Sequence, residues 1–137
     1  MDLRQSLRDF AGRYAAAWCS QDPAAVAGFF APNGKLRVNS GPAAVGRAAI
    51  AQVAQGFMTA FPDMQVLMDD LIIEDDRARF HWTLAGTNTG PGGAGGKVRI
   101  TGYEQWRIGA DSLIAESDGH FDVADYQRQL NRAVDAT

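Results

Sequence analysis

The stretch "GFMTAFPDMQVLMDDLIIEDD", residues 56–76, passes from a helical pattern to a strand pattern with only Phe61-Pro62-Asp63 between them. Pro62 ends the helix, because proline lacks an N–H and disfavours helical geometry in the residue before it. The helix predicted over residues 47–60 therefore meets the next strand at a corner instead of continuing along one axis. The apolar sides of the two segments then face each other, and we expect a cavity between them.

The segments on either side of this corner indicate an α+β fold. Apolar residues at steps of three and four, among them Phe10, Tyr14 and Trp18, predict a helix over residues 3–19. Asp22 and Pro23 suit the start of a second helix over residues 22–30. The remaining pattern predicts strands over residues 35–39, 64–73, 77–87, 97–108 and 112–122, and a short helix over residues 123–134. This order predicts a cone-shaped, curved antiparallel sheet wrapped around N-terminal helices, in a single domain of residues 1–137.

Composition excludes several classes of function. The net charge is −3, and the basic residues are scattered, so we expect no nucleic-acid partner. No window approaches the roughly 18 apolar residues of a membrane span, and the N-terminus lacks a signal-peptide pattern, so we expect a cytoplasmic protein without membrane contact. Cys19 is the only cysteine, which excludes an intrachain disulfide and predicts core packing.

Glu104 is the most informative polar residue. Strand alternation places it on one face with Ile100 and Trp106, where it is the only acid. Apolar surroundings disfavour the charged form of a carboxyl group, so Glu104 could act as a neutral donor or as an acid or base near neutral pH. The alternative is a buried structural glutamate paired with an arginine.

Two further residues are candidates for catalysis together with Glu104. Tyr14 lies on the apolar side of the first helix, where it is either a core tyrosine or a second donor aimed at the same ligand oxygen. His81 could be a base, because an imidazole titrates near physiological pH, or it could be an ordinary core or surface histidine. The sequence leaves open which face of residues 77–87 lines the cavity.

The last strand carries its charges on one face. Binary patterning places these residues toward solvent or a second subunit and the small residues, Ser117 and Gly119, toward the cavity, although a bulge at Gly119 would reverse this. The charged residues lack further ligands for a metal ion, so we expect no metal. They are Glu116, Asp118, His120 and Asp122. The residues expected to contact a substrate are Trp18, Asn39, Phe57, Phe61, Trp106 and Phe121.

The segments "FMTAFPDM", "FHWTLAGTNTG", "GYEQWRI" and "LIAESDGHFD" resemble, in order and spacing, the SnoaL-like branch of the nuclear transport factor 2-like superfamily. The resemblance covers most of the chain. It implies a cone-shaped α+β barrel, a deep apolar pocket without metal or cofactor, and a homodimer formed through the outer face of the sheet. The superfamily contains isomerases, cyclases and lyases that act on small apolar carbonyl compounds, as well as binding and dimerisation domains without catalysis.

The polyketide cyclases of this branch differ from the chain at three positions. Asn88 stands where a histidine is common, and the early-strand histidine corresponds to Val38 or Asn39. Gly119 stands at the position of their acid/base aspartate. The loop "TGPGGAGGKV" is also shorter than the family's segment.

Ketosteroid isomerases offer a second comparison. Tyr14 and Glu104 match the two donors of their oxyanion hole, whereas their early-strand base is missing. The resemblance therefore implies either an enzyme in which His81 supplies the base or a module that binds a small ligand without turnover.

Overall fold

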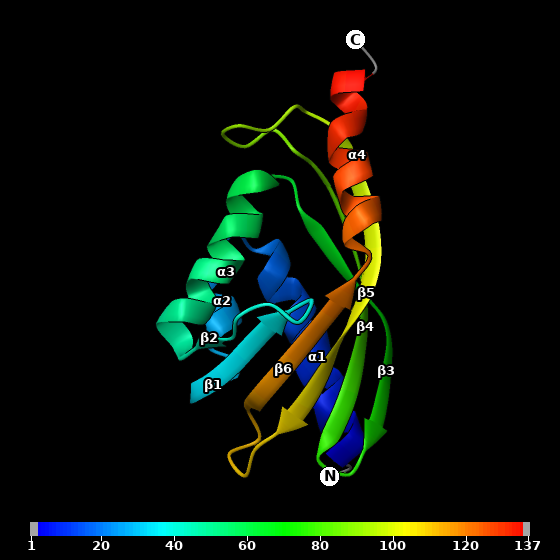
Figure 1. The fold of residues 1–137 in the computed structure, drawn as a ribbon. Coiled ribbons are helices and arrows are strands. Elements are labelled where there is room, and N and C mark those ends of the chain that lie inside the picture. Colours follow the sequence, from blue (N-terminus) through cyan, green and yellow to red (C-terminus); the bar gives the residue numbers. More distant parts are fainter. Residues whose placement is uncertain (1–2, 136–137) are drawn as a thin grey trace.

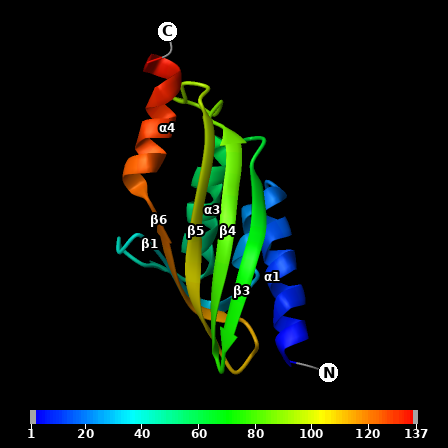
Figure 2. The same cartoon turned by 90° about the vertical axis from the view of Figure 1, so that its right-hand side faces the viewer.

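The computed structural model describes residues 3–135 and, within them, the side chains of residues 5–130. The fold is mixed α+β, with a curved, unclosed six-stranded sheet and the helices α1 to α3 packed along one side of it (Figures 1 and 2). None of the described helices is long and apolar enough to span a bilayer. The elements are α1 (Leu3–Cys19), α2 (Pro23–Ala27), β1 (Phe30–Val38), β2 (Ala44–Val45), α3 (Arg47–Ala60), β3 (Gln65–Glu74), β4 (Arg77–Thr87), β5 (Lys97–Ile108), β6 (Ile114–Phe121) and α4 (Val123–Asp135).

The strand order is β2-β1-β6-β5-β4-β3. Neighbouring strands are antiparallel as predicted except β1 and β6, which are parallel. The helix predicted over residues 22–30 is shorter, since α2 ends at Ala27 and Phe30 already pairs with Ile114 of β6. β1 thus begins before the predicted residue 35, and β2 lies in a segment predicted as a loop.

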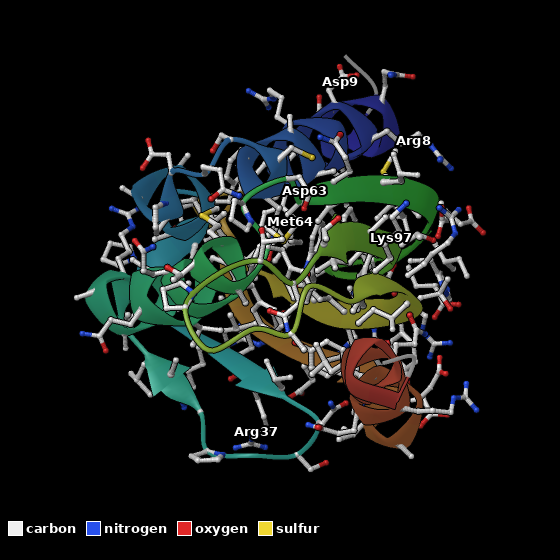
Figure 3. The ribbon with its side chains drawn as sticks, turned by 90° about the horizontal axis from the view of Figure 1, so that it is seen from above. Arg8, Asp9, Arg37, Asp63, Met64 and Lys97 are labelled. Carbon is white, nitrogen blue, oxygen red and sulfur yellow. The ribbon has the colours of Figure 1, made fainter. Side chains whose placement is uncertain are left out.

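The corner after α3 is confirmed. Phe61 closes the last helical turn by donating its N–H to the carbonyl of Phe57 over 2.9 Å. The Asp63 carboxylate accepts hydrogen bonds from the backbone N–H of Thr87 at 2.7 Å and from its hydroxyl at 2.8 Å, which ties the corner to the end of β4. Figure 3 shows Asp63 and Met64 together at this corner. The hydrogen bonds from Thr87, the backbone one foremost, lower the pKa of Asp63.

An aromatic cluster joins α1 to the interior face of the sheet. Phe80 of β4 and Trp106 of β5 stack with ring centroids 5.1 Å apart. Tyr14 stands perpendicular to both, 5.4 Å from Phe80 and 5.2 Å from Trp106. All three side chains are fully buried, and each such burial contributes about 1.5–3 kcal/mol to folding. Phe10, Tyr14 and Trp18, which define the apolar side of α1, are all buried.

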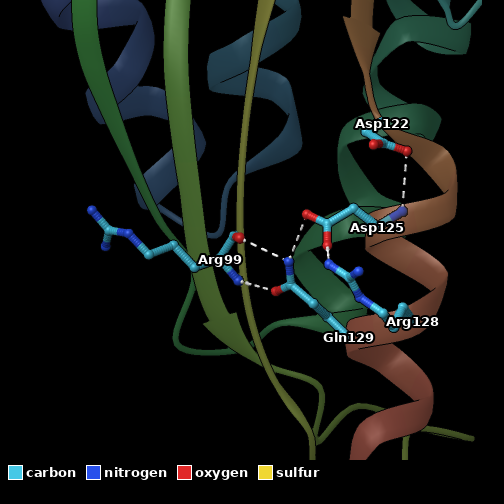
Figure 4. Close-up of polar contacts among 5 residues, drawn as sticks. All are labelled: Arg99, Asp122, Asp125, Arg128 and Gln129. Atoms are coloured by element: carbon cyan, nitrogen blue, oxygen red, sulfur yellow. Dashed lines mark hydrogen bonds and ion pairs between the residues drawn. The ribbon is translucent and has the colours of Figure 1, made fainter.

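Helix α4 supplies hydrogen-bond partners to β5 beyond the point where β6 ends. β6 pairs with β5 only as far as Phe121, opposite Gly102, so Arg99 has no partner strand on that side. The side-chain amide of Gln129 takes this place: its Oε1 accepts from the N–H of Arg99 at 2.7 Å, and its Nε2 donates to the carbonyl of Arg99 at 3.0 Å (Figure 4). Tyr126 packs against Phe121 with ring centroids 5.6 Å apart.

Candidate functional site

A small cavity of about 60 Å³ lies between the helices α1 and α3 and the interior face of the sheet. Its wall is made of aliphatic residues, a glycine, one carboxyl group and four aromatic rings. The rings form two nearly perpendicular pairs, Trp18 with Phe57 at 6.1 Å and Trp82 with Phe121 at 6.0 Å. Glu104 is the only ionisable side chain among the lining residues.

Glu104 is held by three hydrogen bonds to one of its two carboxyl oxygens. Oε1 accepts from the Ser117 hydroxyl at 2.7 Å, the Tyr14 hydroxyl at 2.9 Å and the Trp106 indole N–H at 3.1 Å. The residue is only 7% exposed, and Oε2 has no hydrogen-bond partner within the described part of the chain. The carboxyl group is therefore fixed in orientation, and one of its oxygens is left without a hydrogen bond in a residue that lines the cavity.

Three elements place these donors around the carboxyl group. Glu104 and Trp106 are two residues apart on β5 and so share its interior face. Ser117 of β6 pairs with Trp106, and Gly119 pairs with Glu104, which brings both β6 residues beside the carboxyl group. Tyr14 reaches it from α1 across the core. Disrupting the pairing of β5 with β6 would therefore separate Glu104 from Ser117.

Burial dominates the electrostatics of the site. It raises the pKa of Glu104, and the hydrogen bonds from Ser117, Trp106 and Tyr14 oppose that rise. Burial, followed by the charge of Glu104, raises the pKa of Tyr14 well above its usual value, so the phenol stays a donor. The Trp18 indole N–H is close enough to Tyr14 to oppose this rise in pKa, yet it lies outside hydrogen-bond geometry and has no partner among the described residues.

The structure brings Tyr14 and Glu104 together, but not as two donors aimed at one ligand oxygen. The Tyr14 hydroxyl donates to Glu104 itself, and Tyr14 is fully buried behind the cavity wall. Ser117 completes this network, and sequence analysis gave it no role beyond facing the cavity. Only the register of β5 against β6, a long-range property, would have identified it.

The expected ligand contacts divide into two groups. Trp18, Phe57 and Phe121 line the cavity. Trp106 and Phe61 are fully buried outside the lining, Trp106 as a donor to Glu104 and Phe61 at the corner after α3. Asn39 turns away from the cavity and accepts a hydrogen bond from the N–H of Phe121 at 2.9 Å. The aliphatic lining residues were missed, because nothing in a sequence separates a cavity wall from a filled core.

His81 lies on the other face of the sheet. Phe80 pairs with Glu104 and points inward, so strand alternation turns His81 outward. There its ring is tilted against that of Tyr103, 5.8 Å away, and the ring of Tyr103 lies 5.0 Å from that of His120, along an open groove of about 650 Å³. The structure thus does not bring His81 to Glu104, and His81 cannot reach a ligand in the cavity without a change of face.

The last strand is oriented as its patterning predicted. Ser117 and Gly119 are buried on the interior face, whereas His120 and Asp122 line the outer groove. Among the side chains of residues 5–130, no three of His, Cys, Asp or Glu are grouped so as to hold a metal ion.

Several solved structures share this architecture. TsrD from Streptomyces laurentii is 22% identical and superposes with a TM-score of 0.82, covering 95% of this chain and 97% of that one. A ketosteroid isomerase-like protein from Catenulispora acidiphila, solved with trimethylamine, is 16% identical with a TM-score of 0.79, covering 90% and 92%. SalBIII, an epoxide hydrolase/cyclase-like enzyme of pyran ring formation in salinomycin, is 17% identical with a TM-score of 0.77, covering 91% and 97%.

These identities are low, so the likeness establishes the fold alone. No curated protein matches the chain significantly. The model of the family described as SnoaL-like polyketide cyclase, however, matches residues 8–130, nearly the whole of the chain. The chain therefore belongs to the SnoaL-like polyketide cyclase family.

Proposed function

We propose that the chain binds a small, largely apolar carbonyl compound in the Glu104 cavity and moves a proton to or from it, without a cofactor, through Glu104 Oε2. One observation carries this proposal: a buried carboxyl group lines an otherwise apolar cavity, with three donors on one oxygen and none on the other. An apolar wall suits the carbon skeleton of such a ligand, and the free oxygen suits its acidic C–H group.

The direction of the Glu104 pKa supports a catalytic role. A general base works best when its pKa is near the working pH, and burial raises the pKa of Glu104 in that direction. The ionised Oε2 would take a proton from the carbon beside the carbonyl, and the electron pair of that C–H bond would move into an enolate. The protonated carboxyl group would then return the proton to the same or another carbon.

A single titratable group favours an isomerase over a cyclase or lyase. In an isomerisation one carboxyl group removes the proton and gives it back, whereas ring closure or elimination usually needs an acid and a base at separate places. Glu104 is alone among the lining residues in this respect. SalBIII is described as epoxide hydrolase/cyclase-like, and the family model carries the name of a cyclase, so proton-transfer chemistry has precedents on this fold.

The test is exchange of carbon-bound protons in D₂O. Small ketones are incubated with the protein, and loss of the proton signal beside the carbonyl is followed by NMR. We expect exchange in the wild type and none in Glu104→Gln, because an amide can still accept the three hydrogen bonds but cannot take a proton. Asp118→Asn removes the same charge outside the cavity and should keep the exchange.

A binding module without turnover is the second candidate. It is favoured by the position of Tyr14, whose hydroxyl is engaged by Glu104 and so leaves no phenol free to stabilise an enolate. Ketone binding that quenches tryptophan fluorescence without any exchange would support this candidate and contradict the enzyme.

A further inference from the structure

We infer that Gly119 sets the size of the ligand, and that the cavity takes a short carbonyl compound, the reacting end of which lies in the space left by the missing Gly119 side chain. This inference rests on the proposed function, because it assumes that Glu104 Oε2 meets the ligand.

Gly119 lies at the centre of the sheet, directly beside Glu104. It pairs with Glu104 of β5 on one side and with Val38 of β1 on the other. Its β6 neighbours on the same face are Ser117, a donor to Glu104, and Phe121, a cavity-lining ring. Gly119, Val38 and Glu104 all line the cavity, so a side chain at position 119 would project into it next to the carboxyl group.

The backbone does not require glycine at this position. A Cβ atom built on Gly119 would lie 3.5 Å from the carbonyl oxygen of Arg37 and 3.7 Å from Cγ of Glu104, which are ordinary contacts, and Gly119 is not among the residues with positive φ. Gly102 on β5 offers a contrast. A Cβ atom there would lie 2.3 Å from the carbonyl oxygen of His120 and 2.6 Å from the Trp82 ring, so packing demands glycine. At position 119 the absence of a side chain therefore leaves space in the cavity and is not required by the backbone conformation.

The cavity volume limits the ligand. The cavity of about 60 Å³ has room for several water-sized atoms. Sites for drug-sized ligands are several times larger, about 300–1,000 Å³. The site thus suits a short ketone or aldehyde better than a polycyclic substrate, although the family model is named after polyketide cyclases.

A series of straight-chain ketones from acetone to 2-heptanone tests the inference. Binding is measured from the fluorescence of the lining residues Trp18 and Trp82, and proton exchange is measured in D₂O. In the wild type we expect the tightest binding and the fastest proton exchange with the short ketones, and both should decrease beyond 2-pentanone. In Gly119→Ala the added methyl group should move the optimum to a shorter ketone and weaken the best wild-type ligand about fourfold, the equivalent of one methylene.

Two variants complete the design. Gly12→Ala makes the same change on the exposed side of α1, where nothing lies within 4 Å, and should leave the size profile unaltered. Val38→Ala enlarges the cavity opposite Gly119 and should move the optimum to a longer ketone, which keeps the inference testable if Gly119→Ala does not fold.

The outcomes separate this inference from the proposed function. An identical size profile in the wild type, Gly119→Ala and Val38→Ala would overturn the inference, even if Glu104→Gln abolished exchange. Size-selective binding that shifts with Gly119→Ala, but without exchange in any protein, would support the inference and overturn the enzymatic function alone. A wild type that prefers 2-heptanone would also overturn the inference.

Discussion

Burial and hydrogen bonding have opposite effects on the pKa of Glu104. Removing a carboxylate from water costs several kcal/mol, and hydrogen bonds to its charged form recover part of that cost. Three donors converge on Oε1, yet burial remains the larger effect, because the pKa of Glu104 is raised and not lowered. The folded protein therefore holds the neutral form of this carboxyl group more readily than water does.

This direction of shift predicts how stability depends on pH. A carboxyl group with a raised pKa in the folded state contributes stability that is fully present below its unfolded pKa, about 4.3, and lost as pH rises through its folded pKa. As pH rises above about 4, the wild type should therefore lose unfolding free energy relative to Glu104→Gln until the pH passes the raised folded-state pKa, by at most about 1.4 kcal/mol per pH unit. Urea unfolding of both proteins over this range measures the difference.

Tyr14→Phe supplies the control for this experiment. It keeps the Glu104 carboxyl group and removes one of the hydrogen bonds that oppose the rise in its pKa. The loss of stability should then extend to higher pH than in the wild type. A wild-type and Glu104→Gln difference that stays constant over the whole range would contradict the proposed electrostatics.

The elements differ in how far the sequence could predict them. The corner at Pro62 and the helix over residues 3–19 follow from local rules, and the structure agrees with both. Phe30 was predicted as the end of a helix, because its pairing with Ile114 of β6, far away in the chain, is invisible to a local pattern. The role of Gln129 was hidden for the same reason, since a glutamine on an amphipathic helix normally faces water.

Gln129 should contribute more to the free energy of unfolding than a surface residue does. Gln129→Ala leaves the N–H and carbonyl of Arg99 without their side-chain partner, which we expect to cost about 1–3 kcal/mol of unfolding free energy. Gln129→Glu keeps an acceptor but loses the donor to the Arg99 carbonyl, so its cost should be intermediate. Urea unfolding measures both, and faster amide exchange at Arg99 would localise the effect.

An exposed glutamine provides the comparison. Gln55 lies on α3 and donates a hydrogen bond only to the Thr59 hydroxyl, so Gln55→Ala should change stability by less than about 0.5 kcal/mol. Equal losses in Gln129→Ala and Gln55→Ala would show that the bonds to Arg99 do not support the end of β5.

On the scale of the whole molecule, the sequence indicated that a buried acid would define the site, but it identified few of the residues that surround that acid. The lone acid on an apolar strand face, the phenol on the first helix and the resemblance to ketosteroid isomerases raised the hypothesis that Glu104 and Tyr14 are neighbours, and the structure places them 2.9 Å apart. The position of Ser117 and Gly119 beside Glu104 depends on the register of β5 against β6, and the outward turn of His81 depends on which face of β4 is covered. These are properties of the assembled sheet, so no single segment carries a signal for them.

The outer face of the same sheet predicts association of two chains. Leu67 and Ile72 on the edge strand β3 are 48% and 45% exposed, and they pair with Thr83 and Arg79 of β4, beside the outer groove. Exposed apolar residues on a long edge strand favour contact with another chain.

We therefore expect a homodimer, with a light-scattering mass twice that of one chain. Leu67→Lys with Ile72→Lys should give a monomer through charge repulsion, whereas Val45→Lys on β2, at the opposite edge of the sheet, should leave the dimer intact. A wild type that remains monomeric at high protein concentration would contradict this association.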